Sequence, residues 1–218
     1  MKVKGFQDTI EWYNRNAQAY ASNAIRHNPT KEIDAFASLL TKNANTLDAG
    51  CGSGRDAHFL HKKELNVVGL DISPGLLAVA RKDFPEIQFI EGNLIDLPFK
   101  NETFDGIWSR ASLLHFETIE DVKKALSEFN RVLKKQGLLY VLVKAQTGKE
   151  KTAIVSDTVS HHDRFFQYFL KDELENLLIE AGFQIISLEQ KNELKMQMNN
   201  RPEVEWILSY SRKKNNSK

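Results

Sequence analysis

Apolar positions along the chain alternate between helical and strand-like spacing. Over residues 6–24 they recur every three or four positions, which predicts one amphipathic helix, and Pro29 is well placed to begin a second helix that reaches residue 40. Short apolar runs predict strands near residues 46–49, 66–70, 87–91, 103–108, 137–144, 183–188 and 204–211. Helices are expected between them near residues 54–63, 74–83, 119–132 and 172–181, the last ended by Gly182. Strands that alternate with helices favour a parallel sheet and therefore an α/β fold.

A glycine-rich turn follows the first predicted strand. Gly50, Gly52 and Gly54 alternate with other residues after Asp48, and a second acid, Asp71, ends the next strand. An acid about 20 residues beyond such glycines suits the two hydroxyls of a ribose, so the pattern indicates a nucleoside-binding βαβ unit. A dinucleotide fingerprint would need a glycine where this chain has Arg55. A nucleotide-dependent oxidoreductase is therefore the disfavoured alternative.

Five ordered motifs over about residues 45–145 extend this pattern. They are Asp48–Gly54, Val67–Arg81, Phe89–Phe99, Phe104–Ser109 and Leu126–Leu138. Together they resemble the motifs of the class I S-adenosylmethionine-dependent methyltransferases. The resemblance implies a Rossmann-like sandwich with a seven-stranded, mostly parallel sheet and an antiparallel last strand. It also implies S-adenosyl-L-methionine as the cofactor.

The resemblance assigns cofactor roles to particular residues. Asp48 would bind the methionyl ammonium, and Asp71 would accept hydrogen bonds from both ribose hydroxyls. Ile72 would pack on the adenine, with Asn93 where many relatives have Asp, and the backbone of Leu94 would face the ring. The other expected cofactor residues are Gly50, Gly52, Gly54, Arg55 and Ser109.

The motifs specify fewer residues for binding the methyl acceptor than for binding the cofactor. The resemblance suggests that the N-terminal helix forms a lid, with Tyr20 near the methyl donor and Tyr13 near the substrate. His115, after the fourth strand, is the leading candidate for a general base, which only a protonated acceptor needs. Arg110 and Arg164 are expected to contact the acceptor; Arg164 suits a carboxylate or phosphate, or alternatively pairs with Glu150. An antiparallel excursion over residues 144–168 is expected to cover the site.

Composition narrows the function classes. The net charge of +1 gives no bias towards nucleic acid or a membrane surface, and the one cysteine excludes an internal disulfide. Cys51 is interpreted as structural, and no metal site is expected because the only histidine cluster, His161-His162-Asp163, has adjacent side chains that point apart. With no apolar leader or spanning segment, a cytoplasmic enzyme is expected.

One domain is predicted over residues 1–218. Its parts are a helical lid (1–43), a cofactor-binding core (44–145), a substrate-side segment with the last strands (146–211) and a flexible tail (212–218). The predicted activity is methyl transfer to an oxygen or nitrogen atom of a small molecule. Two alternatives stay open, a tRNA modified-uridine methyltransferase and a non-catalytic partner subunit of the same fold. The sequence does not indicate the oligomeric state.

Overall fold

The computed structural model describes residues 5–24, 29–156, 163–196 and 201–215. Its main feature is one seven-stranded sheet. In spatial order the strands are β3 (Gln88–Glu91), β2 (Asn66–Asp71), β1 (Asn45–Ala49), β4 (Phe104–Arg110), β5 (Leu133–Lys144), β9 (Glu205–Lys213) and β8 (Phe183–Asn192). β9 runs antiparallel to both of its neighbours, and the pairs from β3 to β5 are parallel. The predicted α/β class and the antiparallel last strand are confirmed.

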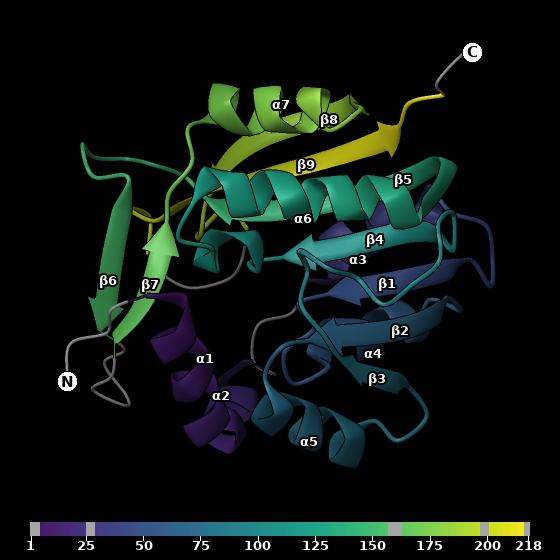
Figure 1. Ribbon diagram of the computed structural model, residues 1–218, viewed down its shortest axis with the longest axis horizontal. Coiled ribbons are helices and arrows are strands. Elements are labelled where there is room, and N and C mark those ends of the chain that lie inside the picture. The colour runs from purple at the N-terminus through teal and green to yellow at the C-terminus, as the bar shows by residue number, and fades with distance from the viewer. Residues whose placement is uncertain (1–4, 25–28, 157–162, 197–200, 216–218) are drawn as a thin grey trace.

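Helices cover both faces of this sheet (Figure 1). They are α1 (Phe6–Arg15), α2 (Ala17–Ala24), α3 (Thr30–Ser38), α4 (Arg55–His61), α5 (Pro74–Asp83), α6 (Ile119–Val132) and α7 (Lys171–Glu180), with a short 3₁₀ turn, η1, at Leu113–His115. In Figure 1, α6 and α7 lie in front of the sheet, and α3 and α4 lie behind it. The core is continuous through both layers; the ring of Trp108 on β4 stacks on Tyr140 of β5 and meets Phe36 of α3 edge-on. No described helix is long and apolar enough to span a bilayer.

The prediction of a single helix over residues 6–24 is wrong, because the helix breaks at Asn16. Asn16 has φ −112° and ψ 16°, outside the helical region, and its side-chain amide donates to the Trp12 carbonyl at 2.9 Å. Asparagine competes in this way with the helical backbone for its hydrogen bonds. The break gives α1 and α2 different directions, which apolar periodicity alone does not reveal.

Other boundaries differ by a few residues. β5 begins at Leu133, directly after α6 and four residues before the predicted start at residue 137, with Gln136 at φ 61°. β9 continues through Lys213, two residues into the segment expected to be a flexible tail. Gly182 follows α7 at φ 86°, as predicted for the residue after the helix cap.

The predicted excursion after β5 is a separate two-stranded antiparallel hairpin, β6 (Thr152–Ser156) and β7 (Asp163–Gln167). β7 contacts α1, since the Phe165 amide donates to the Thr9 hydroxyl at 3.1 Å. α1 is also tied to the start of α5, where Asn14 Oδ1 accepts from the Gly75 amide at 3.0 Å. In Figure 1 the hairpin, α1 and α2 lie together beyond one end of the sheet strands. The parallel strands end at that same edge, with Asp71, Arg110 and Lys144 as their last residues.

Candidate active site

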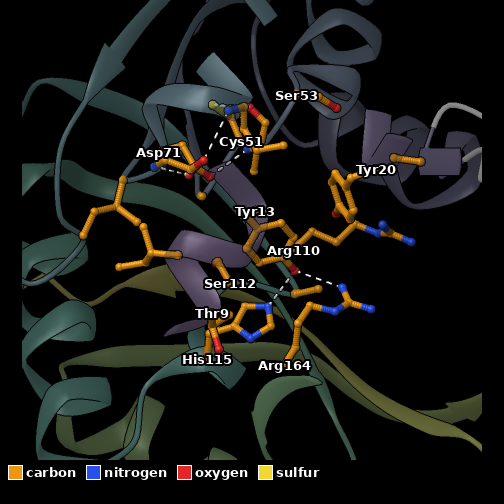
Figure 2. A pocket seen from close by; sticks show the side chains of 18 of the residues that line it. Thr9, Tyr13, Tyr20, Cys51, Ser53, Asp71, Arg110, Ser112, His115 and Arg164 are labelled. Carbon is orange, nitrogen blue, oxygen red and sulfur yellow. Dashed lines mark hydrogen bonds between the residues drawn. The ribbon is translucent and has the colours of Figure 1, made fainter. Parts of the chain in front are cut away.

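A cavity of about 340 Å³ lies at this carboxyl edge of the sheet. The strand ends and the glycine turn form one wall, and α1, α2 and β7 form the other. Figure 2 shows Asp71 and Cys51 at one side of the cavity, His115 and Arg164 at another, and Tyr13 between them. The predicted site residues all line it except Gly54 and Ser109. Sheet edges of this kind are where open α/β folds bind ligands.

The glycine turn has the left-handed backbone that favours glycine. Gly50 has φ 83°, and a Cβ there would lie 2.4 Å from the Cβ of Ser112. Gly54, at φ 82°, begins α4, and a Cβ there would lie 2.8 Å from the ring of Phe89. Gly54 therefore serves packing behind the cavity wall, whereas Gly50 and Gly52 present backbone to the cavity itself.

Asp71 is held in place by the turn. Its two carboxylate oxygens each accept one backbone N–H, from Gly52 at 2.8 Å and from Ser73 at 2.9 Å. Burial raises the pKa of Asp71, and these two amides partly offset that effect. Each carboxylate oxygen has two lone pairs, so one on each remains for a ligand. A fixed carboxylate of this kind can accept from two adjacent hydroxyls.

Asp48 is the second carboxylate of the cavity. It is 2% exposed, and its Oδ2 has no hydrogen-bond partner among the residues the structure describes. Burial, with Asp56 and Asp71 nearby, raises the pKa of Asp48 well above its usual range. A buried acceptor without a donor is costly, and a bound cation would relieve that cost.

Asp56 joins a compact group of charges beneath the cavity. Its carboxylate accepts from Arg55 Nε at 2.6 Å and from the buried Trp108 indole at 3.0 Å, with Arg110 4.0 Å away. Burial alone would raise the pKa of Asp56, but the two arginines outweigh it and lower that pKa. Arg55 Nη1 also donates to the Ala24 carbonyl at 2.9 Å, so this guanidinium links α4 to α2. These contacts set the positions of both predicted arginines at the cavity wall.

A hydrogen-bonded chain crosses the other side of the cavity. Arg164 Nη1 donates to the Tyr13 hydroxyl at 3.1 Å, and that oxygen lies 3.1 Å from His115 Nε2 (Figure 2). His115 Nδ1 lies 2.9 Å from the Phe165 carbonyl, which can only accept, so Nδ1 carries the hydrogen. Nε2 is then the acceptor for Tyr13.

Burial and the cations of Arg164 and Lys144 lower the pKa of His115 to about 3, while the Phe165 carbonyl opposes the shift. The imidazole is therefore neutral at pH 7. Burial also raises the pKa of Tyr13, so its hydroxyl keeps its proton and donates it to His115. In this arrangement His115 holds Tyr13 and is a weak base.

Comparisons with known proteins agree with this geometry. Residues 47–141 match the family model described as a methyltransferase domain. This stretch is therefore similar to a methyltransferase domain, and the fold is that of the class I S-adenosylmethionine-dependent methyltransferases. The chain is 36% identical over 110 residues to the ubiquinone/menaquinone biosynthesis C-methyltransferase UbiE of Campylobacter jejuni. That match covers 47% of this chain and 46% of the relative, so the chain spans about half the length of the curated relatives it matches.

Two solved structures share the fold along almost the whole chain. One is a Burkholderia thailandensis 1,6-didemethyltoxoflavin-N1-methyltransferase with bound 1,6-didemethyltoxoflavin and S-adenosylhomocysteine, with a TM-score of 0.73 at 18% identity, covering 96% of this chain and 88% of that one. The other is the cyclase SpnF, with a TM-score of 0.74 at 19% identity, covering 98% of each chain. At these identities the likeness concerns the fold.

The other predicted residues occupy several positions around the cavity. Ile72, Asn93 and Leu94 line the cavity beside Asp71, and Asn93 Oδ1 accepts from the Ile95 amide at 3.2 Å. Tyr20 lies over the glycine turn, where a Cβ on Gly52 would be 3.8 Å from its ring. Ser109 lies behind the wall, and its hydroxyl is 2.8 Å from that of Ser112, which does line the cavity.

Several cavity residues were not among those predicted. Among them are Lys144, which ends β5, and Trp12 of α1. Three more come from the last two strands and the segment between them: Glu193, Arg201 and Trp206. Lys144 had a signal in the sequence, since a cation that ends an apolar parallel strand lies at the ligand-binding edge. The last three are brought in by the antiparallel β8–β9 pair, for which no local motif exists.

The described residues contain no group of three or more His, Cys, Asp or Glu side chains that could hold a metal ion. His161 and His162 lie outside the described residues. Burial raises the pKa of the Cys51 thiol well above its ordinary value, and its Sγ lies 3.8 Å from the Gly52 carbonyl. A protonated, buried thiol is a poor nucleophile.

Proposed function

We propose that this chain transfers a methyl group from S-adenosylmethionine to an oxygen or nitrogen atom of a small-molecule acceptor. The observation that carries the proposal is the pair of cavity carboxylates. Asp71 keeps a lone pair on each oxygen for the ribose hydroxyls, and Asp48 has a buried oxygen to which no described residue donates. The methionyl ammonium is a donor of the kind that Asp48 lacks.

S-adenosylmethionine, when bound, supplies an electrophilic methyl group whose leaving group is a neutral thioether. The protein then has mainly to align the acceptor with that methyl group and to exclude water. α1 and β7 suit that purpose, because their residues line the cavity on the side opposite the strand ends. Tyr13 and His115 would receive the acceptor's polar atom, with Tyr20 near the glycine turn.

The arrangement of basic residues favours a small molecule over tRNA. A tRNA acceptor would call for a basic face beside the cavity that includes both Lys134 and Lys144. Lys134 lies near the start of β5 and pairs with Asp105 at 2.8 Å, whereas Lys144 lies at the far end of that strand, at the cavity. The B. thailandensis neighbour has 1,6-didemethyltoxoflavin bound.

Binding of the cofactor and of its demethylated product tests the proposal. S-adenosylhomocysteine at about 100 times its dissociation constant should stabilise the protein by about 2.7 kcal/mol and raise its melting temperature by about 5–10 °C. Asp71→Asn, which keeps the side-chain shape and an acceptor oxygen, should weaken binding at least about tenfold. Asp83→Asn, on the exposed end of α5, is the matched control and should bind as the wild type does.

Three results would contradict the proposal or a part of it. Folded wild-type protein that binds neither S-adenosylmethionine nor S-adenosylhomocysteine would overturn the proposal and favour a non-catalytic subunit. Stabilisation by NAD alone would favour an oxidoreductase. Equal binding by Asp71→Asn and Asp83→Asn would remove Asp71 from the site.

A further inference from the structure

Hydrogen-bond donors gather at the end of the cavity away from Asp71. Lys144 brings an ammonium group, and Arg164 brings a guanidinium. The Trp12 indole N–H is buried in a side chain that is 5% exposed, and it has no partner in the described part of the chain. Lysine, arginine and tryptophan side chains can only donate hydrogen bonds. This end of the cavity is therefore complementary to an acceptor of hydrogen bonds.

Aromatic rings hold the two cations close together. Lys144 Nζ lies 4.2 Å from the centroid of the Phe166 ring, and the Arg164 guanidinium carbon lies 5.4 Å from the same centroid. Lys144 also faces the Trp206 ring at 5.6 Å, and Arg164 lies over Trp12 at 4.7 Å. Ring faces attract cations but carry no net negative charge, so the ring contacts of Lys144 do not neutralise its ammonium group.

Lys144 has no carboxylate within ion-pair distance among the described residues. The acid that influences it is Glu193, which is 0% exposed and already paired. Arg201 contacts both Glu193 oxygens at 2.8 Å, and the Trp206 indole donates to one of them at 3.1 Å. Burial, with Arg201 and Arg164 nearby, lowers the pKa of Lys144 to about 8, so it is still mostly charged at pH 7.

We propose that the methyl acceptor is an anion, and that its carboxylate or phosphate group binds the Lys144 ammonium, with Arg164 and the Trp12 N–H as neighbouring donors. The aromatic walls of this end, Trp12, Phe166 and Trp206, suit an anionic group carried on a flat, apolar body. This inference rests on the proposed function, since it specifies the acceptor of the same cavity.

The anion would also change His115. Lys144 and Arg164 both disfavour a proton on the imidazole. A negative group between those cations and the ring offsets their effect, so the imidazole becomes a better proton acceptor when the substrate is in place. The Tyr13 hydroxyl, hydrogen-bonded to His115 Nε2, then lies where an acceptor's proton would leave.

Calorimetric titration tests the anion site with three probes of one shape: benzoate, phenyl phosphate and neutral benzamide. The protein is first saturated with S-adenosylhomocysteine. At least one of the two anions should bind wild type about tenfold or more tightly than benzamide, and the better one identifies the group. Lys144→Met keeps the apolar stem without the charge and should lose that preference. Lys144→Arg should keep it.

Lys62→Met is the matched control, because Lys62 also lies over a phenylalanine ring, Phe59 at 6.0 Å, but outside the cavity. It should bind the anions as wild type does. Wild type without a preference for either anion over benzamide, or an undiminished preference in Lys144→Met, overturns the anion site. The saturating titration separates this failure from that of the proposed function: bound S-adenosylhomocysteine without anion preference leaves the cofactor assignment standing.

Discussion

His115 should make the stability of the folded protein sensitive to mild acid. An imidazole in the unfolded chain has a pKa of about 6.5, whereas in the folded protein burial and two cations lower the pKa of His115 to about 3. Between these values the unfolded state holds one more proton than the folded state. Stability therefore rises with pH across this window and is lost as the pH falls below about 6.5.

The size of the effect follows from the two pKa values. Going from pH 8 to pH 5, the unfolded state gains about 2 kcal/mol from protonation of this one ring. That figure is an upper value, because the ring borders the cavity and water reaches it. For a chain of this length it corresponds to a fall in melting temperature of about 4–8 °C.

Urea unfolding of wild type and His115→Asn at pH 5, 6.5 and 8 isolates this contribution. Asparagine can still donate to the Phe165 carbonyl but does not titrate. The variant also loses the hydrogen bond to Tyr13, which changes its free energy of unfolding by the same amount at every pH. As the pH is lowered from 8 to 5, the free energy of unfolding of the variant should therefore rise relative to that of wild type by up to about 2 kcal/mol. His61→Asn, at an exposed position, should follow the wild-type profile. Parallel pH profiles for wild type and His115→Asn would refute the reasoning.

Two further predictions concern the cofactor side. Gly50→Ala places a Cβ against Ser112 at positive φ, which should lower the free energy of unfolding by about 1–3 kcal/mol and weaken S-adenosylhomocysteine binding. Gly148→Ala is the control, because the space around Gly148 is open. Equal melting temperatures for the two variants would contradict the prediction. Asp48→Asn removes a carboxyl whose pKa is raised by burial, so the stability of wild type relative to this variant should fall as the pH rises above about 4. The same variant should bind the cofactor more weakly by calorimetry, and a variant with unchanged affinity would remove Asp48 from the site.

The cofactor side was largely predictable because local motifs encode it. One turn sets the positions of Asp48 and the glycines, and Asp71 ends the strand that pairs with β1 directly. Strand alternation fixes which end of the sheet these residues share. Ser109 shows the limit of this reasoning, since its side chain lies behind the wall, whereas Ser112, three residues further along the chain, lines the cavity.

The acceptor side was only partly predictable because distant segments build it. Tyr13, His115 and Arg164 were each proposed separately, but their hydrogen-bonded chain spans sequence separations of 102 and 151 residues. The chain of hydrogen bonds depends on α1, which is a separate helix that ends before Asn16 and contacts β7. Helical periodicity does not reveal where a helix breaks. Glu193 and Arg201 enter only through the order of the last two strands.

Acidic side chains lie at the cofactor end of the cavity, and basic side chains lie at the acceptor end. At the cofactor end, burial raises the pKa of Asp48 and Asp71, which is the mark of carboxylates that lack a cation. At the acceptor end, burial and like charges lower the pKa of Lys144 and His115, which is the mark of bases that lack an anion. Both shifts carry a free-energy cost that a ligand of opposite charge removes. A sulphonium cofactor with its ammonium and an anionic acceptor would each relieve one end, and the two would then meet near Tyr13, where the methyl group has to pass between them.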